Sequence, residues 1–227
     1  MIRAVFFDLD GTLVDSAPEL TAGVNGLMKV VRLRPFSVEE VSRMVGKGVR
    51  VLIERVCDAR GIFPTDQTVS LMMREYAKIM SELDMPASFY AGALEGVGLL
   101  KAKGFKVVLV TNKLRSMTEQ FLERNDIATL FDALVCGDDT PHPKPAPDMI
   151  ALACSKVEVD PQYAVMVGDS ANDALAARAA HVRAVLVKTG YNEGIPIEAW
   201  AKAHGFDCVF DDAAQVCAEI TAGRLRL

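Results

Sequence analysis

The chain has 227 residues, of which 51% are hydrophobic, and its formal net charge is −5 at pH 7. This length and apolar content suffice for one large domain, or for a core domain that carries a smaller inserted one. The acidic balance argues against a nucleic-acid partner, because phosphate backbones are bound by basic surfaces. No apolar run approaches the roughly 18 residues of a membrane span, so no membrane partner is expected.

Five cysteines are scattered along the chain, and none forms a C-x-x-C pair. Scattered single cysteines are typical of proteins in a reducing compartment. The N-terminal stretch MIRAVFFDLD lacks the layout of a secretory signal, since its apolar run is short and ends in acids. Together these features predict a cytoplasmic protein. They leave open whether it is a monomer or a homodimer.

The first predicted element is a buried strand over residues 2–7, IRAVFF. Residues 16–85 then show the apolar spacing of helices. Two predicted capping boxes support helix starts there, Ser16 with Glu19 and Ser37 with Glu40. A single crossover to a second strand does not need a segment of this length. We therefore expect residues 16–85 to form a small helical domain inserted after the first strand.

Further strands are predicted where short Val-rich runs recur, at residues 106–111, 133–136, 163–168 and 183–187. These runs do not alternate with polar residues, which is typical of a parallel sheet covered on both faces. Amphipathic stretches at 93–103, 115–125, 146–155 and 171–180 separate them. Alternating strands and helices predict an α/β fold with a doubly wound, Rossmann-like parallel sheet, formed by residues 1–15 and 86–227.

Polar side chains follow the predicted strands where ligands bind in such folds, beyond the carboxyl ends. They are Asp8 and Asp10 after the first strand, Thr111 and Asn112 after the second, Lys144 before the fourth, and Asp169, Ser170 and Asp173 after the fourth. Clustered carboxylates repel one another, and a divalent cation removes that cost. Oxygen ligands without His or Cys favour Mg²⁺, and an adjacent lysine suits an anion such as phosphate.

Each of these residues has a simpler interpretation when it is taken alone. Asp10 with Gly11 is also a turn signal, and Ser170 with Asp173 is also a helix cap. Lys144, between prolines, is also compatible with a surface loop. The agreement of four separate positions on one crevice favours a binding site over these local interpretations.

The motifs DLDGT (8–12), TN (111–112), Lys144 in PKPAPD and GDSAND (168–173) resemble, in order, the four motifs of the haloacid dehalogenase superfamily of phosphohydrolases. The inserted helical stretch resembles that superfamily's small helical cap. Within the superfamily the chain is most similar to bacterial phosphoglycolate phosphatases, on the segments DGTLVDS (10–16), MVGKGVRVLIERV (44–56) and TGYNEGIPI (189–197).

The resemblance implies Mg²⁺-dependent hydrolysis of a small phosphomonoester through a phosphoaspartate. Asp8 is then the nucleophile, and Asp10 is the acid for the leaving alcohol and the base for water. Carried over motif by motif, the other roles are Mg²⁺ binding by Asp8, Asp169 and the Asp10 carbonyl, phosphoryl binding by Thr111, the Asn112 amide and Lys144, and support of the site by Asp173 and Ser170. The resemblance also implies that Asp173 acts through a water or by bonding Lys144.

Asp10 favours phosphate esters, because the superfamily's dehalogenases have no alkoxide to protonate and lack this aspartate. The cap is expected to select the substrate, and the turn VGKGVR (45–50) offers Lys47 and Arg50 to a small carboxylate such as that of 2-phosphoglycolate. The simpler interpretation is that both are solvated surface cations beside glycines that end one helix and start the next. Two alternatives stay open: a phosphatase of sugar phosphates such as N-acetylmuramic acid 6-phosphate, or a phosphosugar mutase on the same scaffold. A phosphoacceptor signalling module fits less well, because receivers are about half this length and have no helical insert.

Overall fold

The structure is a computed structural model that describes residues 1–225. Within them, six parallel strands form one sheet in the order β3-β2-β1-β4-β5-β6. The strands are β1 (Ala4–Phe7), β2 (Lys106–Thr111), β3 (Ala133–Cys136), β4 (Ala164–Gly168), β5 (Arg183–Val187) and β6 (Val209–Phe210). The predicted α/β fold with a parallel sheet is thus confirmed. The sequence patterns do not predict β6, because two residues are too short to show a period.

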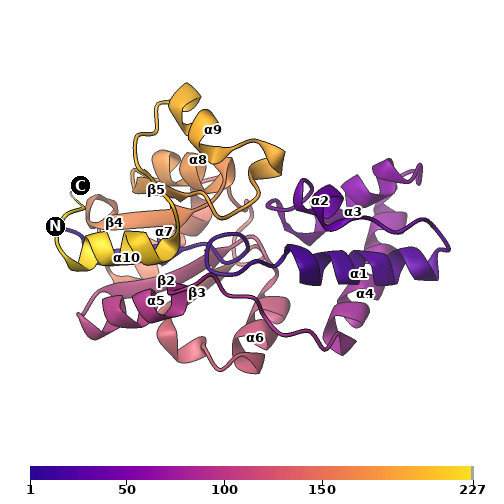
Figure 1. Cartoon of the computed structure of the whole chain (residues 1–227), viewed down its shortest axis with the longest axis horizontal. Helices are drawn as coiled ribbons and strands as arrows, with labels where there is room; N and C mark the ends of the chain where they lie inside the picture. Colours follow the sequence, from indigo (N-terminus) through magenta and orange to yellow (C-terminus); the bar gives the residue numbers. More distant parts are fainter. Residues whose placement is uncertain (226–227) are drawn as a thin grey trace.

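Helices cover both faces of the sheet, as Figure 1 shows. On one face lie α5 (Ala93–Ala102), α6 (Arg115–Arg124) and α10 (Ala213–Thr221), and on the other α7 (Asp148–Val157), α8 (Ala171–Ala179) and α9 (Ile197–His204). Along β1, Val5 and Phe7 join the first hydrophobic cluster while Ala4 and Phe6 join the second, and all four are fully buried. A strand buried on both sides has no polar face, so its sequence reads as a continuous apolar run.

Four further helices form the cap, at the right of Figure 1. They are α1 (Ala17–Val30), α2 (Val38–Ser42), α3 (Gly48–Ala59) and α4 (Asp66–Glu82), and they enclose a hydrophobic cluster of their own. The chain enters and leaves the cap side by side, because Asp15 N–H donates to the Ser88 carbonyl at 2.8 Å and Val14 bridges to Phe89. This double crossing places the cap over the carboxyl ends of the strands. Three short 3₁₀ helices, Ala128–Leu130, Pro161–Tyr163 and Asn192–Gly194, complete the elements.

The two predicted capping boxes have different outcomes. At Ser37 the box is present, with Glu40 N–H donating to the Ser37 hydroxyl and Ser37 N–H to the Glu40 carboxylate. At Ser16 the prediction is wrong, because Glu19 turns away and accepts a 2.6 Å hydrogen bond from Arg124 of α6. A charged partner from the core stabilises Glu19 more than one backbone amide does.

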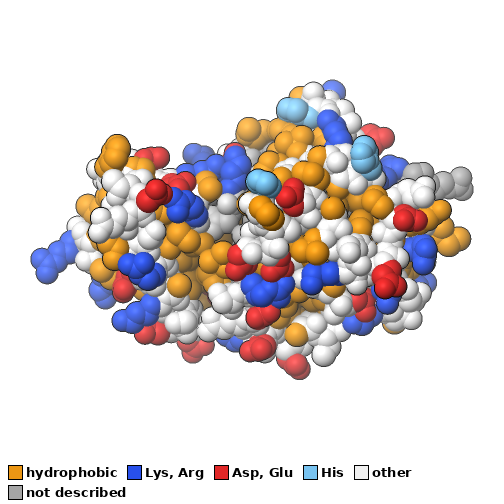
Figure 2. Space-filling model, turned by 180° about the vertical axis from the view of Figure 1, so that it is seen from behind, with side chains coloured by type: hydrophobic (Ala, Val, Ile, Leu, Met, Phe, Trp, Pro, Cys, Tyr) orange, Lys and Arg blue, Asp and Glu red, His pale blue; other side chains and the backbone are white. Residues whose placement is uncertain are grey.

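The surface carries charges of both signs. Figure 2 shows Lys and Arg interspersed with Asp and Glu over the visible face, without a broad basic field. Among residues 1–225, no helix has the length and apolar character needed to cross a membrane. All five cysteines are buried and free.

Candidate active site

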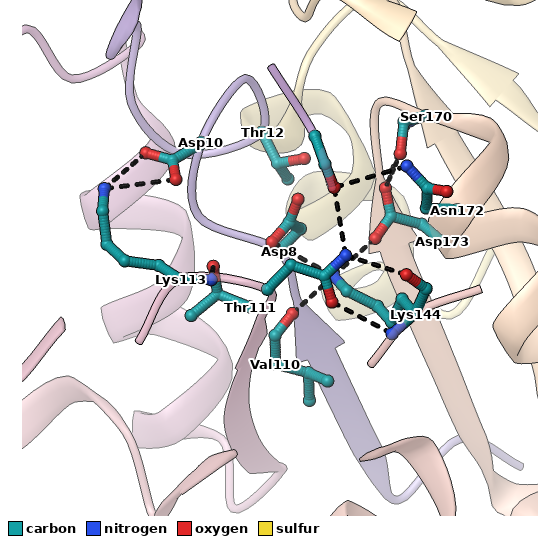
Figure 3. Close-up of polar contacts among 12 residues, drawn as sticks. Asp8, Asp10, Thr12, Val110, Thr111, Lys113, Lys144, Ser170, Asn172 and Asp173 are labelled. Atoms are coloured by element: carbon teal, nitrogen blue, oxygen red, sulfur yellow. Dashed lines mark hydrogen bonds and ion pairs between the residues drawn. The ribbon is translucent and has the colours of Figure 1, made fainter. Parts of the chain in front are cut away.

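Lys144 lies at the centre of a buried charge cluster at the carboxyl ends of the strands, shown in Figure 3. Its ammonium is 3.1 Å from Asp8 Oδ1 and 2.6 Å from Asp173 Oδ1, and it donates to the Val110 carbonyl at 2.6 Å. Val110 and Asp173 accept hydrogen bonds from the ammonium, and Asp8 forms an ion pair with it. Lys144 therefore connects the ends of β1 and β2 with the first turn of α8, and these segments are far apart in the sequence.

Three carboxylates meet beside this lysine. Asp8, Asp169 and Asp173 each offer an oxygen, and these oxygens all lie within 4.8 Å of one another. Asp169 is held by Thr12 Oγ1 and by the Tyr191 amide, each at 3.0 Å. Gly190 is needed behind it, because a Cβ there would lie 1.9 Å from Asp169 Oδ2. The fold thus gathers three carboxylates, and the backbone at Gly190 and Tyr191 packs closely around one of them, Asp169.

Burial is the main influence on the protonation of this cluster. It raises the pKa of Asp8 to about 7, and although Lys144 opposes the rise, the charges of Asp173 and Asp10 add to it. Burial, then Asp173 and Asp8, also raise the pKa of Asp169 well above its usual value. Burial alone would lower the pKa of Lys144, but Asp173 and Asp8 outweigh it and raise that pKa.

This donor set fits a divalent cation. Asp8 Oδ1 is buried and has no hydrogen-bond donor, and its contact with Lys144 is ionic without the geometry of a hydrogen bond. A cation between Asp8 and Asp169 would offset the charge that burial makes costly, and hard oxygen ligands suit Mg²⁺.

We expect Mg²⁺ to stabilise the protein more at about pH 8 than at about pH 5.5, because protons compete for the same carboxylates at acidic pH. Burial raises the pKa of Asp8 from 3.8 to about 7, so between these two pH values the metal-free folded protein binds a proton that the unfolded chain releases. The free energy of unfolding of the metal-free protein therefore falls as the pH rises from about 4 to about 7. At pH 8 and a hundredfold excess over Kd, the melting temperature should rise by about 5–10 °C. Thermal melts with and without Mg²⁺ measure this shift.

Two variants provide the comparison for these melts. Asp169→Asn should lose most of the Mg²⁺ shift, and Asp160→Asn, on the exposed surface, should keep it. An equal shift at both pH values, or one retained in Asp169→Asn, would remove this cluster as the metal site.

Asp10 lies on the other side of the site and pairs with Lys113. The Lys113 ammonium is 2.8 Å from Asp10 Oδ1 and 3.1 Å from Oδ2, and Lys113 is only 8% exposed. Sequence reasoning missed Lys113, although it directly follows Thr111 and Asn112 at the end of β2. It missed Thr12 as well, which belongs to the DLDGT motif itself. Proximity to a motif was the available signal in both cases.

The Asn112 side chain bonds the backbone of Lys144 and of the cap. Its Oδ1 accepts from the Lys144 amide at 3.0 Å, and its Nδ2 donates to the Lys144 carbonyl at 2.9 Å and to the Gly46 carbonyl of the cap at 3.0 Å. Asn172 donates to the same Gly46 carbonyl at 3.3 Å. The side chains of Asn112 and Asn172 therefore hold the cap against the core.

Ser170 precedes α8, and Asp173 lies in the first turn of that helix. The backbone N–H and hydroxyl of Ser170 donate to Asp173 Oδ2 at 3.2 and 2.7 Å, while Oδ1 of Asp173 receives Lys144. Of the two possibilities expected for Asp173, the structure has the direct bond to Lys144. The helix-cap interpretation is confirmed, and the supporting role of Ser170 and Asp173 in the site stays a prediction.

The cap cations Lys47 and Arg50 do not face the site. Lys47 Nζ lies 2.9 Å from Glu193, and Arg50 pairs with Glu54 at 2.9 Å and with Asp66. Neither lines the cavity between cap and core. Their part in substrate recognition remains a prediction, and in the structure each of them forms ion pairs with carboxylates of the protein.

That cavity has about 510 Å³ of empty space, open solvent at its mouth included. Asp8, Asp10, Thr111 and Asn112 line it from the core. The predicted nucleophile, the predicted acid and two predicted phosphoryl ligands thus share one space.

Comparison with known proteins agrees with this geometry. The haloacid dehalogenase-like hydrolase family matches residues 5–187. A phosphoglycolate phosphatase of Nitrosospira multiformis is 37% identical over 198 residues, which cover 85% of this chain and 86% of the relative. The phosphoglycolate phosphatase of Escherichia coli K12 is 35% identical over 215 residues, covering 87% and 85%.

Among solved structures, one of a predicted phosphoglycolate phosphatase from Haemophilus somnus superposes with a TM-score of 0.87 at 32% identity, covering 97% of this chain and 98% of that one. The relatives cover most of the chain, and the family match over residues 5–187 includes Asp8, Lys144 and Asp169. The chain therefore belongs to the haloacid dehalogenase-like hydrolases.

Proposed function

We propose that this hydrolase is a Mg²⁺-dependent phosphatase of small phosphomonoesters, with 2-phosphoglycolate as its leading substrate. The observation that carries the proposal is the position of Asp8: it lines the cavity together with Asp10, it lies beside Lys144, and one of its carboxylate oxygens is buried without a hydrogen-bond donor. An oxygen left open in this way suits a nucleophile facing an anionic phosphoryl group. The names of the similar relatives support the choice of substrate.

In the proposed reaction, an Asp8 oxygen attacks phosphorus and the ester oxygen leaves with a proton from Asp10. Asp10 then takes a proton from the water that hydrolyses the phosphoaspartate. Lys144, Thr111 and the Asn112 amide hold the phosphoryl oxygens. When bound by Asp8, Asp169 and the Asp10 carbonyl, Mg²⁺ neutralises carboxylate charge and polarises the phosphoryl group.

The cavity wall favours a small leaving group over a sugar. Among the described cap residues that line it, only Tyr76 has a polar side chain, and neighbours such as Leu20, Val49 and Leu52 are apolar. A sugar would bury several hydroxyls against this wall without partners, which is costly. A two-carbon leaving group has few polar atoms to satisfy.

The test is phosphate release from a panel of esters, with Mg²⁺ and with a chelator. The panel contains 2-phosphoglycolate, N-acetylmuramic acid 6-phosphate, hexose 6-phosphates and β-glucose 1-phosphate. We expect activity only with Mg²⁺, and kcat/KM highest for 2-phosphoglycolate by at least about tenfold. Preference for a sugar phosphate would overturn the substrate, and Mg²⁺-independent turnover would overturn the role given to the metal.

A further inference from the structure

Tyr76 has a buried hydroxyl that lacks a partner. It lies within α4 of the cap, it is 1% exposed, and its hydroxyl makes no hydrogen bond in the structure. A buried polar group without a partner is rare and calls for an explanation. Tyr76 lines the same cavity as Asp8 and Asp10. The free hydroxyl is therefore available to a ligand that fills this cavity.

The position of the Tyr76 ring is fixed by its neighbours. A Cβ at Gly23 of α1 would lie 2.8 Å from the ring, so the glycine makes room for it. Burial, together with the charges of Asp10 and Glu19, raises the pKa of Tyr76 above its usual value. The hydroxyl thus keeps its proton and can donate it to an acceptor.

Lys113 is the second donor at this cavity. Of the described residues that line it, Lys113 alone is cationic. Its ammonium has three N–H donors, and two of them bond the two oxygens of Asp10. The third N–H is therefore available to a ligand. Lys144 does not line this cavity, and the Val110 carbonyl and Asp173 accept two of its hydrogens.

We infer that Tyr76 and Lys113 together form the subsite for a carboxylate on the leaving group. A carboxylate only accepts hydrogen bonds, so a hydroxyl and an ammonium suit it, and the apolar wall around them strengthens the charge-assisted contact. This inference rests on the proposed phosphatase function and specifies how that function selects its substrate. It assigns to Tyr76 and Lys113 the recognition predicted for Lys47 and Arg50.

The subsite spans both parts of the protein. Tyr76 comes from the cap and Lys113 from the core, so the subsite exists where the cap packs against the core. The hydrogen bonds from Asn112 and Asn172 to the Gly46 carbonyl maintain that packing. A carboxylate-bearing substrate would therefore bind most tightly to the closed form, where Asp8 is shielded from water.

The cleaner test is Tyr76→Phe, because the Tyr76 hydroxyl bonds no protein group. Steady-state kinetics compare 2-phosphoglycolate with ethyl phosphate, which has a leaving group of two carbons and no carboxylate. We expect kcat/KM for 2-phosphoglycolate to fall about tenfold, mainly through KM, and that for ethyl phosphate to stay within about twofold. Tyr163→Phe, a tyrosine outside the cavity, should leave both unchanged.

Lys113→Met probes the charge. Because Lys113 also contacts Asp10, kcat should fall for both esters, so the informative quantity is the ratio of their kcat/KM values. We expect the preference for 2-phosphoglycolate to shrink by about 10- to 100-fold. Lys78→Met, an exposed lysine on α4, should keep the preference, and thermal melts verify that each variant is folded.

Equal losses on both esters in Tyr76→Phe and Lys113→Met would overturn the subsite. So would a loss of preference in Lys47→Ala that exceeds theirs. Glycolate binding, followed by NMR titration with Mg²⁺ and inorganic phosphate present, tests the subsite without turnover, and both variants should weaken it at least about tenfold. If the parent protein binds glycolate but hydrolyses neither ester, the proposed function is wrong and the subsite stands. If the parent protein does not bind glycolate, the subsite is wrong.

Discussion

Asp8→Asn should abolish phosphate release, lowering kcat by at least about 10⁴-fold while the fold persists. Asparagine has the shape of aspartate but is a far poorer nucleophile, so no phosphoaspartate forms. Lys144 retains its 2.6 Å contact with Asp173 in this variant, which keeps its charge paired. Phosphate release in the presence of Mg²⁺, together with a thermal melt, measures both parts of the expectation.

The covalent step itself can be followed by acid quenching. With ³²P-labelled substrate, the parent enzyme should retain label after the quench, and Asp8→Asn should retain none. Hydroxylamine should release the label from the parent, because it cleaves acyl phosphates such as a phosphoaspartate. Asp160→Asn makes the same chemical change on the exposed surface and should behave as the parent does. Activity within tenfold of the parent in Asp8→Asn would show that another group attacks phosphorus.

Lys144→Met should have the largest effect on stability, because it leaves Asp8 and Asp173 buried without their cation. Removing one member of a buried ion pair costs about 3–5 kcal/mol, which for a chain of this size lowers the melting temperature by about 10–15 °C. The pKa of Asp8 should rise further, since Lys144 lowers it. Protonation then relieves the penalty, so the loss in a chelator-containing buffer should be smaller at about pH 5.5 than at about pH 8.

A second variant separates charge from packing. Adding Asp173→Asn to Lys144→Met removes one orphaned charge and should restore part of the lost stability. Lys156→Met, on the exposed side of α7, should change the melting temperature by little. If Lys144→Met also melts near the parent, or if the double variant is less stable than Lys144→Met, the charge cluster is not what Lys144 stabilises.

Local patterns were enough for the sheet and for the order of the site residues. In β1 and β4, continuous apolar runs mark strands buried on both faces, and the next polar residues, Asp8 and Asp169, therefore lie at strand ends. The capping box at Ser37 is equally local, since both partners lie within one turn. At Ser16 the same pattern failed, because Arg124 of the core competes for Glu19.

By itself, then, the sequence determined that this chain forms a parallel α/β sheet, because periodicity and chain order are properties of neighbouring residues. It also placed seven polar residues at the carboxyl end of that sheet: Asp8, Asp10, Thr111, Asn112, Lys144, Asp169 and Asp173. Only the tertiary structure decided that Lys113 reaches Asp10, that Tyr76 keeps a free hydroxyl, and that Lys47 pairs with Glu193. Partners such as Lys47 and Glu193 are distant in sequence, and their pairing depends on how the cap packs against the core. No local pattern encodes that packing, which is why the chemistry could be predicted from motifs while the selection of substrate could not.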